Sequence, residues 1–105
     1  MTTLTDFRDQ TLFESWEGEI EASQLAATRL LFRQLIDDLI GAGEHASSAN
    51  ITQKFERCVK GLNKLDEEKQ FICTIEREEL CDELYAIGAA TGMPDDDWVD
   101  EWRDW

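Results

Sequence analysis

The chain has 105 residues, and its 24 acidic and 10 basic side chains give it a formal net charge of −14. This length holds one domain, residues 1–105, and the 42% hydrophobic content is enough for a small core, so the acidity does not by itself indicate disorder. No apolar run reaches the roughly 20 residues that a membrane span needs, and the first residues do not resemble a signal peptide. We therefore expect a cytoplasmic protein.

The sign of the charge also limits the partners. A strongly negative surface repels phosphate backbones and anionic lipid headgroups, which argues against direct binding of nucleic acid or membrane. Between residues 53 and 69 five basic side chains form a weak basic patch, but four acidic ones nearly cancel it. A basic protein is the partner that this composition favours.

The first twenty residues have a mixed apolar spacing. Phe7, Phe13, Trp16 and Ile20 follow one another at steps that fit neither a regular helix nor a clear strand. A helix broken near Gly18 is favoured over a strand.

Two long amphipathic helices are predicted next. Residues 23–40 repeat apolar side chains every three or four positions, and Gly41 and Gly43 supply the end of this helix. A second helix starts near Ser48 or Asn50 and presents one apolar stripe: Ile51, Phe55, Cys58, Val59, Leu62 and Leu65.

Residues 71–75 are apolar and are expected to form a short extended link, or a turn that places Phe71 and Ile72 beneath the helices. Thr74 is the expected N-cap of a third helix that runs to about Thr91 and ends at Gly92. The residues that follow predict a last short helix with Asp95, Asp96 and Asp97 as its cap and with Trp98, Trp102 and Trp105 on one stripe. The predicted fold is all-α, a compact bundle of about four helices with a short C-terminal Trp-rich helix.

Catalytic and metal-binding patterns are missing. Gly41-Ala42-Gly43 lacks the flanking elements of a phosphate loop, and His45 is expected to be an exposed loop residue. The run that starts at Asp95 lacks the glycine and the twelfth-position glutamate of a calcium loop. Three cysteines, Cys58, Cys73 and Cys81, fit neither a disulfide framework nor a zinc site, and they are predicted to be reduced and mostly buried. We predict no enzyme activity, no metal and no cofactor.

Negative charge is concentrated near the C-terminus. Residues 76–105 contain eleven acidic side chains against Arg77 and Arg103 alone. Such a field speeds the approach of a cationic surface, and an exposed indole among carboxylates would be a binding anchor, although packing of the tryptophans into the core is the commoner explanation. The predicted partner-binding residues are Glu76, Glu79, Asp82, Glu83, Asp96, Asp97, Asp100, Glu101 and Trp98.

Three stretches resemble small acidic immunity proteins of bacterial polymorphic toxin systems. They are residues 55–65, residues 71–81 with the string Glu-Arg-Glu-Glu-Leu-Cys, and residues 101–105 with the string Trp-Arg-Asp-Trp. The resemblance implies a cytoplasmic antitoxin that binds a cognate toxin domain and occludes its active site. Such toxins are often nucleic-acid-targeting enzymes with cationic clefts, which suits an acidic inhibitor.

Two other functions remain open from the sequence. A DNA mimic that inhibits a nucleic-acid-binding protein would use the same charge, but it should space its carboxylates like phosphates along a long surface. A regulatory adaptor or helical-bundle subunit is the other alternative, and a homodimer formed through the tryptophan stripe would favour it. The sequence leaves the oligomeric state undetermined.

Overall fold

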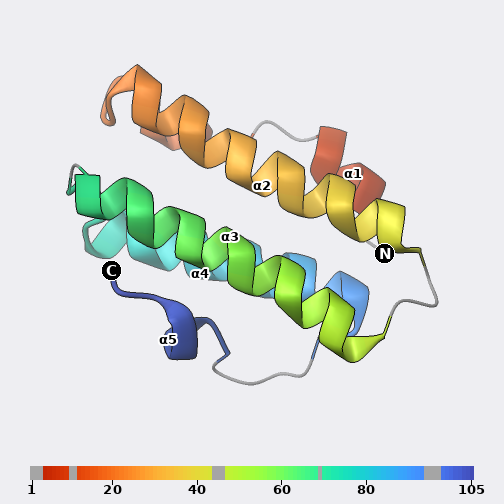
Figure 1. Cartoon of the computed structure of the whole chain (residues 1–105). Helices are drawn as coiled ribbons and strands as arrows, with labels where there is room; N and C mark the ends of the chain where they lie inside the picture. Colours follow the sequence, from red (N-terminus) through yellow and green to blue (C-terminus); the bar gives the residue numbers. More distant parts are fainter. Residues whose placement is uncertain (1–3, 10–11, 44–46, 69, 94–97) are drawn as a thin grey trace.

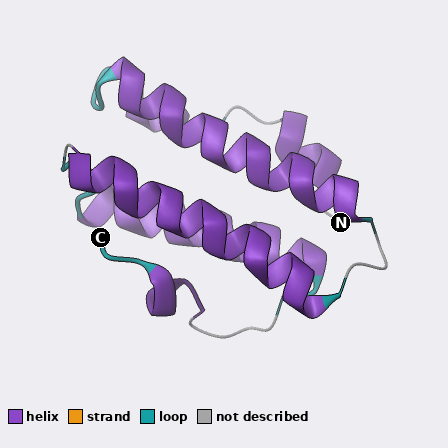
Figure 2. Ribbon diagram, viewed as in Figure 1, coloured by secondary structure: helices purple, strands orange, loops and turns teal. Residues whose placement is uncertain are grey.

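The computed structural model describes residues 4–9, 12–43, 47–68, 70–93 and 98–105, and these ranges contain helices but no β-strand. Figures 1 and 2 show three long helices with shorter ones packed around them. The elements are α1 (Leu4–Asp9), the 3₁₀-helix η1 (Glu14–Trp16), α2 (Ala22–Ala42), α3 (Ser48–Glu68), α4 (Thr74–Thr91) and α5 (Trp98–Trp102). The predicted all-α bundle with a short Trp-rich helix near its C-terminal end is confirmed.

Helices α2, α3 and α4 alternate in direction and form the body of the bundle. In Figure 1, α2 and α3 lie side by side and α4 lies behind α3. A close approach at Gly61 brings α3 against α2, because a Cβ atom built there would lie 2.8 Å from Cδ2 of Leu31. The apolar stripes meet between the helices, where Phe32, Phe55 and Leu84 are fully buried.

The N-terminal segment covers one side of this body. Helix α1 packs against α2 and α4, and Phe7 is buried there. In η1, the ring of Trp16 stacks on Phe13 with 4.6 Å between centroids, and Phe13 meets Phe32 of α2 edge to face. The helical structure does break before Gly18, whose φ of +84° is easiest for glycine, so the predicted break near this residue is confirmed.

The C-terminal segment is held by its tryptophans. The Trp98 ring lies edge to face with Phe55 of α3 at 4.9 Å and with Tyr85 of α4 at 5.0 Å. Gly88 of α4 leaves room for this indole, because a Cβ there would lie 2.9 Å from Trp98 Cζ2. Trp105 lies beyond the end of α5 and is also buried.

Of the two predicted ends of α4, the structure confirms one. Gly92 ends the helix in the left-handed conformation, as predicted. The cap prediction at the other end is wrong: Cys73 is the N-cap and Thr74 is the first helical residue, and a Glu76 carboxylate oxygen accepts the backbone N–H of Cys73 at 3.0 Å. The predicted cap formed by Asp95, Asp96 and Asp97 lies outside the described residues, as does His45.

Residues 71–73 link α3 to α4 without regular structure. Asp66, near the end of α3, accepts the backbone N–H groups of Phe71 and Ile72 at 3.0 Å each. Both of these side chains are buried, so the link does place them beneath the helices. No helix in the described ranges is long and apolar enough to cross a membrane.

The cysteines differ in their surroundings. Cys58 is buried in α3, and this burial raises the pKa of its thiol to about 12. Cys81 is half-buried, whereas Cys73 is exposed, so the prediction of mostly buried thiols is wrong for Cys73. The reason is its N-cap position, where the chain turns into the exposed start of α4.

Candidate protein-binding surface

The acidic residues of α4 occupy different sides of the helix. Leu80, Leu84 and Ile87 are fully buried toward the core. Glu76, Glu79 and Glu83 are half-buried, and each follows the last by three or four residues. Glu78 and Asp82 are exposed on the adjoining side. The helical spacing predicts these two adjoining acidic faces, and in the structure the face of Glu78 and Asp82 is the exposed one.

Two of the predicted binding residues are engaged within the chain. Glu76 holds the start of α4, as described above. Glu79 accepts hydrogen bonds from Ser15 Oγ, with the shorter distance at 3.2 Å, and from the indole N–H of Trp16. Because Trp16 is only 2% exposed, its N–H has lost contact with water and depends on this carboxylate. Glu79 therefore links η1 to α4, and the sequence contains no periodic signal for such a long-range pair.

Glu83 occupies a third kind of environment. One of its carboxylate oxygens is buried and has no hydrogen-bond partner among the described residues. Burial, together with the neighbouring charge of Asp82, raises the pKa of Glu83 above its ordinary value of 4.5. This carboxyl group is more costly to ionise than an exposed one, so it is poorly suited to binding a cation at the surface.

The structure brings acidic residues of α4 and α5 to one region. Burial raises the pKa of the half-buried Cys81 thiol, and the negative charges of Asp100 and Asp82 raise it further. Arg77 and Arg103 lie close enough to the same thiol to oppose this rise. Asp82 and Asp100 therefore lie within electrostatic reach of the same thiol, together with both arginines of the region.

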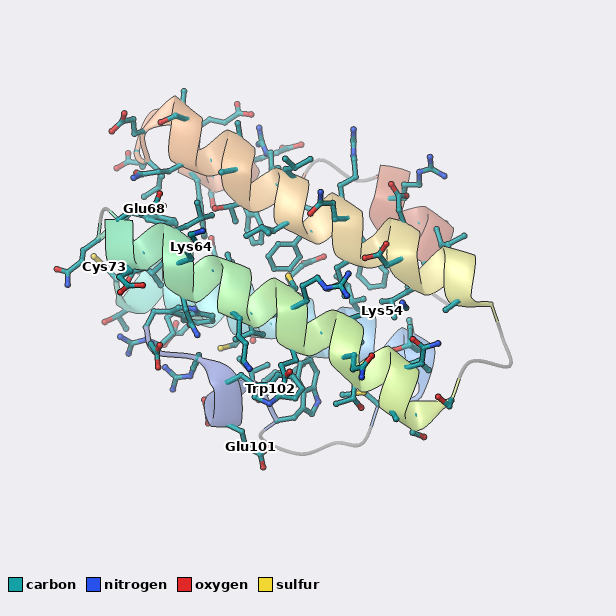
Figure 3. All side chains as sticks on the ribbon, in the orientation of Figure 1. Lys54, Lys64, Glu68, Cys73, Glu101 and Trp102 are labelled. Atoms are coloured by element: carbon teal, nitrogen blue, oxygen red, sulfur yellow. The ribbon has the colours of Figure 1, made fainter. Side chains whose placement is uncertain are left out.

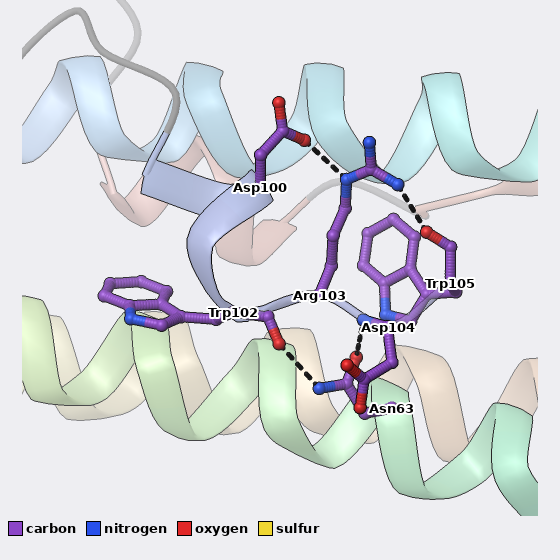
Figure 4. A network of polar contacts seen from close by, with 6 residues as sticks. All are labelled: Asn63, Asp100, Trp102, Arg103, Asp104 and Trp105. Carbon is purple, nitrogen blue, oxygen red and sulfur yellow. Dashed lines mark hydrogen bonds and ion pairs between the residues drawn. The ribbon is translucent and has the colours of Figure 1, made fainter.

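Internal contacts also occupy the C-terminal segment. Figure 4 shows Arg103 between Asp100, whose carboxylate lies 2.5 Å from its Nε, and the backbone oxygen of Trp105. The Asn63 side chain of α3 donates to the carbonyl of Trp102 and accepts from the N–H of Asp104, both at 2.8 Å. Glu101 and Asp104 are both exposed.

Trp98 has a structural role in this conformation. Only 6% of its surface is exposed, and its ring lies among Phe55, Tyr85 and Trp102. The commoner explanation given above, packing of the tryptophans into the core, is thus the one that the structure shows for Trp98 and Trp105. Asp96 and Asp97 lie outside the described residues.

One apolar residue on the surface was missed by the sequence reasoning. Ile75 is 66% exposed in the first turn of α4, although it closes the apolar run 71–75. Its helical spacing relative to Glu78 and Asp82 could have revealed it, because these positions share one side of the helix. We call Ile75, Glu78 and Asp82 the outer α4 stripe. Neither Glu78 nor Asp82 forms an ion pair or a hydrogen bond with another described residue.

The described residues do not bring together three side chains able to hold a metal ion. Comparison of the chain with protein-family models, with curated proteins and with solved structures found no match.

Proposed function

We propose that this protein is an immunity-type inhibitor that binds a basic toxin domain and covers its active site. The observation that supports this best is the outer α4 stripe, in which an exposed isoleucine lies beside two carboxylates that form no ion pair with another described residue. The exposed Glu101 and Asp104 of the C-terminal segment add negative charge. The segment resemblance to immunity proteins set out above agrees with this assignment.

The proposed mechanism is steric and electrostatic, with no chemical step. Carboxylates that are exposed and pair with no other described residue are available to an incoming cationic cleft, and their negative charge speeds the encounter with it. Ile75 provides apolar area that becomes buried on docking, and the surrounding charges form the rim of the interface. Glu76 and Glu79 are excluded from this interface, because their carboxylates already stabilise α4 and η1.

The length of the stripe argues against the DNA-mimic alternative. From Ile75 to Asp82 the helix advances by seven residues, roughly 10 Å, which matches only a few successive phosphates. A dimer formed through the tryptophans, which would have favoured the adaptor alternative, has little support because Trp98 and Trp105 are buried within their own chain.

The proposal predicts that a toxin-domain protein is encoded next to this chain, and the test uses that protein. Titration calorimetry would compare the native protein with the double variant Glu78→Lys/Asp82→Lys. A matched control, Glu14→Lys/Glu19→Lys, changes the net charge equally at two exposed residues that lie outside α4 and outside the outer α4 stripe. We expect at least tenfold weaker binding for the stripe variant and a smaller loss for the control. Equal affinity of all three proteins, or a neighbouring gene that encodes no toxin domain, would contradict the proposal.

A further inference from the structure

Part of the weak basic patch between residues 53 and 69 lies on the face of the molecule opposite the outer α4 stripe. Arg57, Lys60 and Lys64 are exposed and follow one another along α3 at steps of three and four residues. Figure 3 looks onto this face, formed by α2 and α3, and labels Lys54 and Lys64 on it. We call Arg57, Lys60 and Lys64 the basic α3 stripe.

The internal partners of the basic α3 stripe are weak. Arg57 Nη1 lies 3.9 Å from an Asp38 carboxylate oxygen, and Lys60 Nζ lies 3.5 Å from Glu56 one turn away. Exposed pairs of this kind contribute little and exchange readily with other partners. No ion pair or hydrogen bond links Lys64 to the described part of the chain. The stripe therefore offers cationic groups to an incoming anionic surface.

The two stripes are complementary in sign and in spacing. Arg57, Lys60 and Lys64 have the i, i+3, i+7 spacing that Ile75, Glu78 and Asp82 also have, so each stripe is roughly 10 Å long. If the two helices pack antiparallel, Asp82 of one copy meets Arg57 of the next, and Glu78 meets Lys60. Ile75 then lies at the level of Lys64.

We propose that the basic α3 stripe of one copy binds the outer α4 stripe of a second copy. Helix α4 lies behind α3 (Figure 1), and each stripe lies on the side of its helix away from the fully buried residues, so the two stripes are on opposite sides of the molecule. The contact is therefore head to tail, and it extends to a third copy rather than closing as a dimer. It also covers the surface assigned above to the toxin, so self-association and toxin binding compete.

The charge of −14 on each copy opposes this contact over long distances. At about 0.15 M salt the screening length is about 8 Å, so the repulsion between whole molecules is reduced while paired charges in contact still attract. Near 1 M salt the screening length falls to about 3 Å and the contact pairs weaken as well. We expect weak association that is strongest at intermediate salt.

Sedimentation velocity of the purified protein over a concentration series tests this proposal without any toxin. The average mass should rise with concentration at about 0.15 M salt and rise less at both salt extremes. The variant Glu78→Lys/Asp82→Lys should associate at least tenfold more weakly, although its net charge is smaller. The control Glu14→Lys/Glu19→Lys reduces the net charge equally and should associate at least as well as the native protein.

The decisive variant exchanges the charges of both stripes in one chain. Arg57→Glu/Lys60→Glu should abolish the association, and adding Glu78→Lys/Asp82→Lys should restore it at unchanged net charge. Circular dichroism checks that each variant is folded, and all four positions are exposed. A native protein that stays monomeric at every salt concentration, or a fourfold variant that fails to regain association, would overturn the proposal. Neither outcome affects the proposed inhibition of a toxin.

Discussion

Glu79 and Glu78 are adjacent in the sequence, yet the structure gives them different roles. The Glu79 carboxylate accepts hydrogen bonds from Ser15 and from the buried indole of Trp16, whereas Glu78 is exposed. We predict that Glu79→Ala lowers the free energy of unfolding by about 1–3 kcal/mol, because it leaves the Trp16 N–H buried without an acceptor. Urea denaturation measures this loss.

The matched control for Glu79 is Glu78→Ala, which removes the same charge one residue away. It should change the free energy of unfolding by less than about 0.5 kcal/mol, as is usual for a surface position. Equal effects of the two substitutions would mean that the link between η1 and α4 contributes nothing to stability.

From the raised pKa of Glu83 we predict that the stability of the protein depends on pH. Burial, and to a lesser extent Asp82, raises the pKa of Glu83 in the folded protein above the ordinary 4.5. The folded state therefore holds this proton more tightly than the unfolded state does, so stability falls as pH rises from about 4.5 through the folded pKa. The unfavourable contribution is complete above that value.

We expect Glu83→Gln to be more stable than the native protein at pH 7, by roughly 0.5 kcal/mol because the group is half exposed. Below pH 4.5 the gain should vanish, since the native carboxyl is then protonated as well. Denaturation curves at several pH values measure both effects. Glu78→Gln serves as the comparison, and an identical gain there would show that the effect comes from net charge rather than from burial.

At the scale of helices, apolar spacing in the sequence predicted α2, α3 and α4 well. Each of these helices buries one continuous stripe, and Gly92 ends α4 where its positive φ is needed. The contacts that place η1 and the C-terminal segment could not be predicted. They join residues far apart in the chain, such as Glu79 with Trp16 and Asn63 with Asp104, and periodicity contains no information about such pairs.

A substitution at Gly88 tests how closely α5 packs against α4. A Cβ at this position would lie 2.9 Å from Cζ2 of the Trp98 ring and 3.3 Å from Cβ of Met93. Since a buried indole cannot easily move, we predict that Gly88→Ala destabilises the protein by about 1–3 kcal/mol, as overpacking does. The fluorescence of the tryptophans should shift to longer wavelength if the segment becomes more exposed to water.

Gly41 is the control for Gly88, because it is also helical but a Cβ added to it would meet nothing within 4 Å. Gly41→Ala should leave the protein unchanged or stabilise it by up to about 1 kcal/mol. If both alanine variants are more stable than the native protein, the close packing of Trp98 against α4 is disproved.

For the whole molecule, salt changes the folding stability in two opposing ways: through the repulsion that belongs to the net charge of −14, and through the surface ion pairs. Salt screens the repulsion among the excess carboxylates, which favours folding, but it also weakens exposed pairs such as Arg8 with Asp37 and Arg29 with Glu17. Such pairs contribute at most about 1 kcal/mol each. The excess of 24 acidic over 10 basic side chains leaves many carboxylates with no cation to pair with, so repulsion should dominate.

We therefore predict that the melting temperature rises when sodium chloride increases from about 0.02 M to about 0.3 M, where the screening length falls well below the size of the molecule. Calorimetry at a low protein concentration measures the shift without the self-association proposed above. The double variant Glu14→Gln/Glu19→Gln removes two exposed charges and should show a higher melting temperature at low salt and a smaller rise with salt. A melting temperature that falls as salt is added would mean that the ion pairs outweigh the repulsion, and that this acidic surface is better compensated than its net charge indicates.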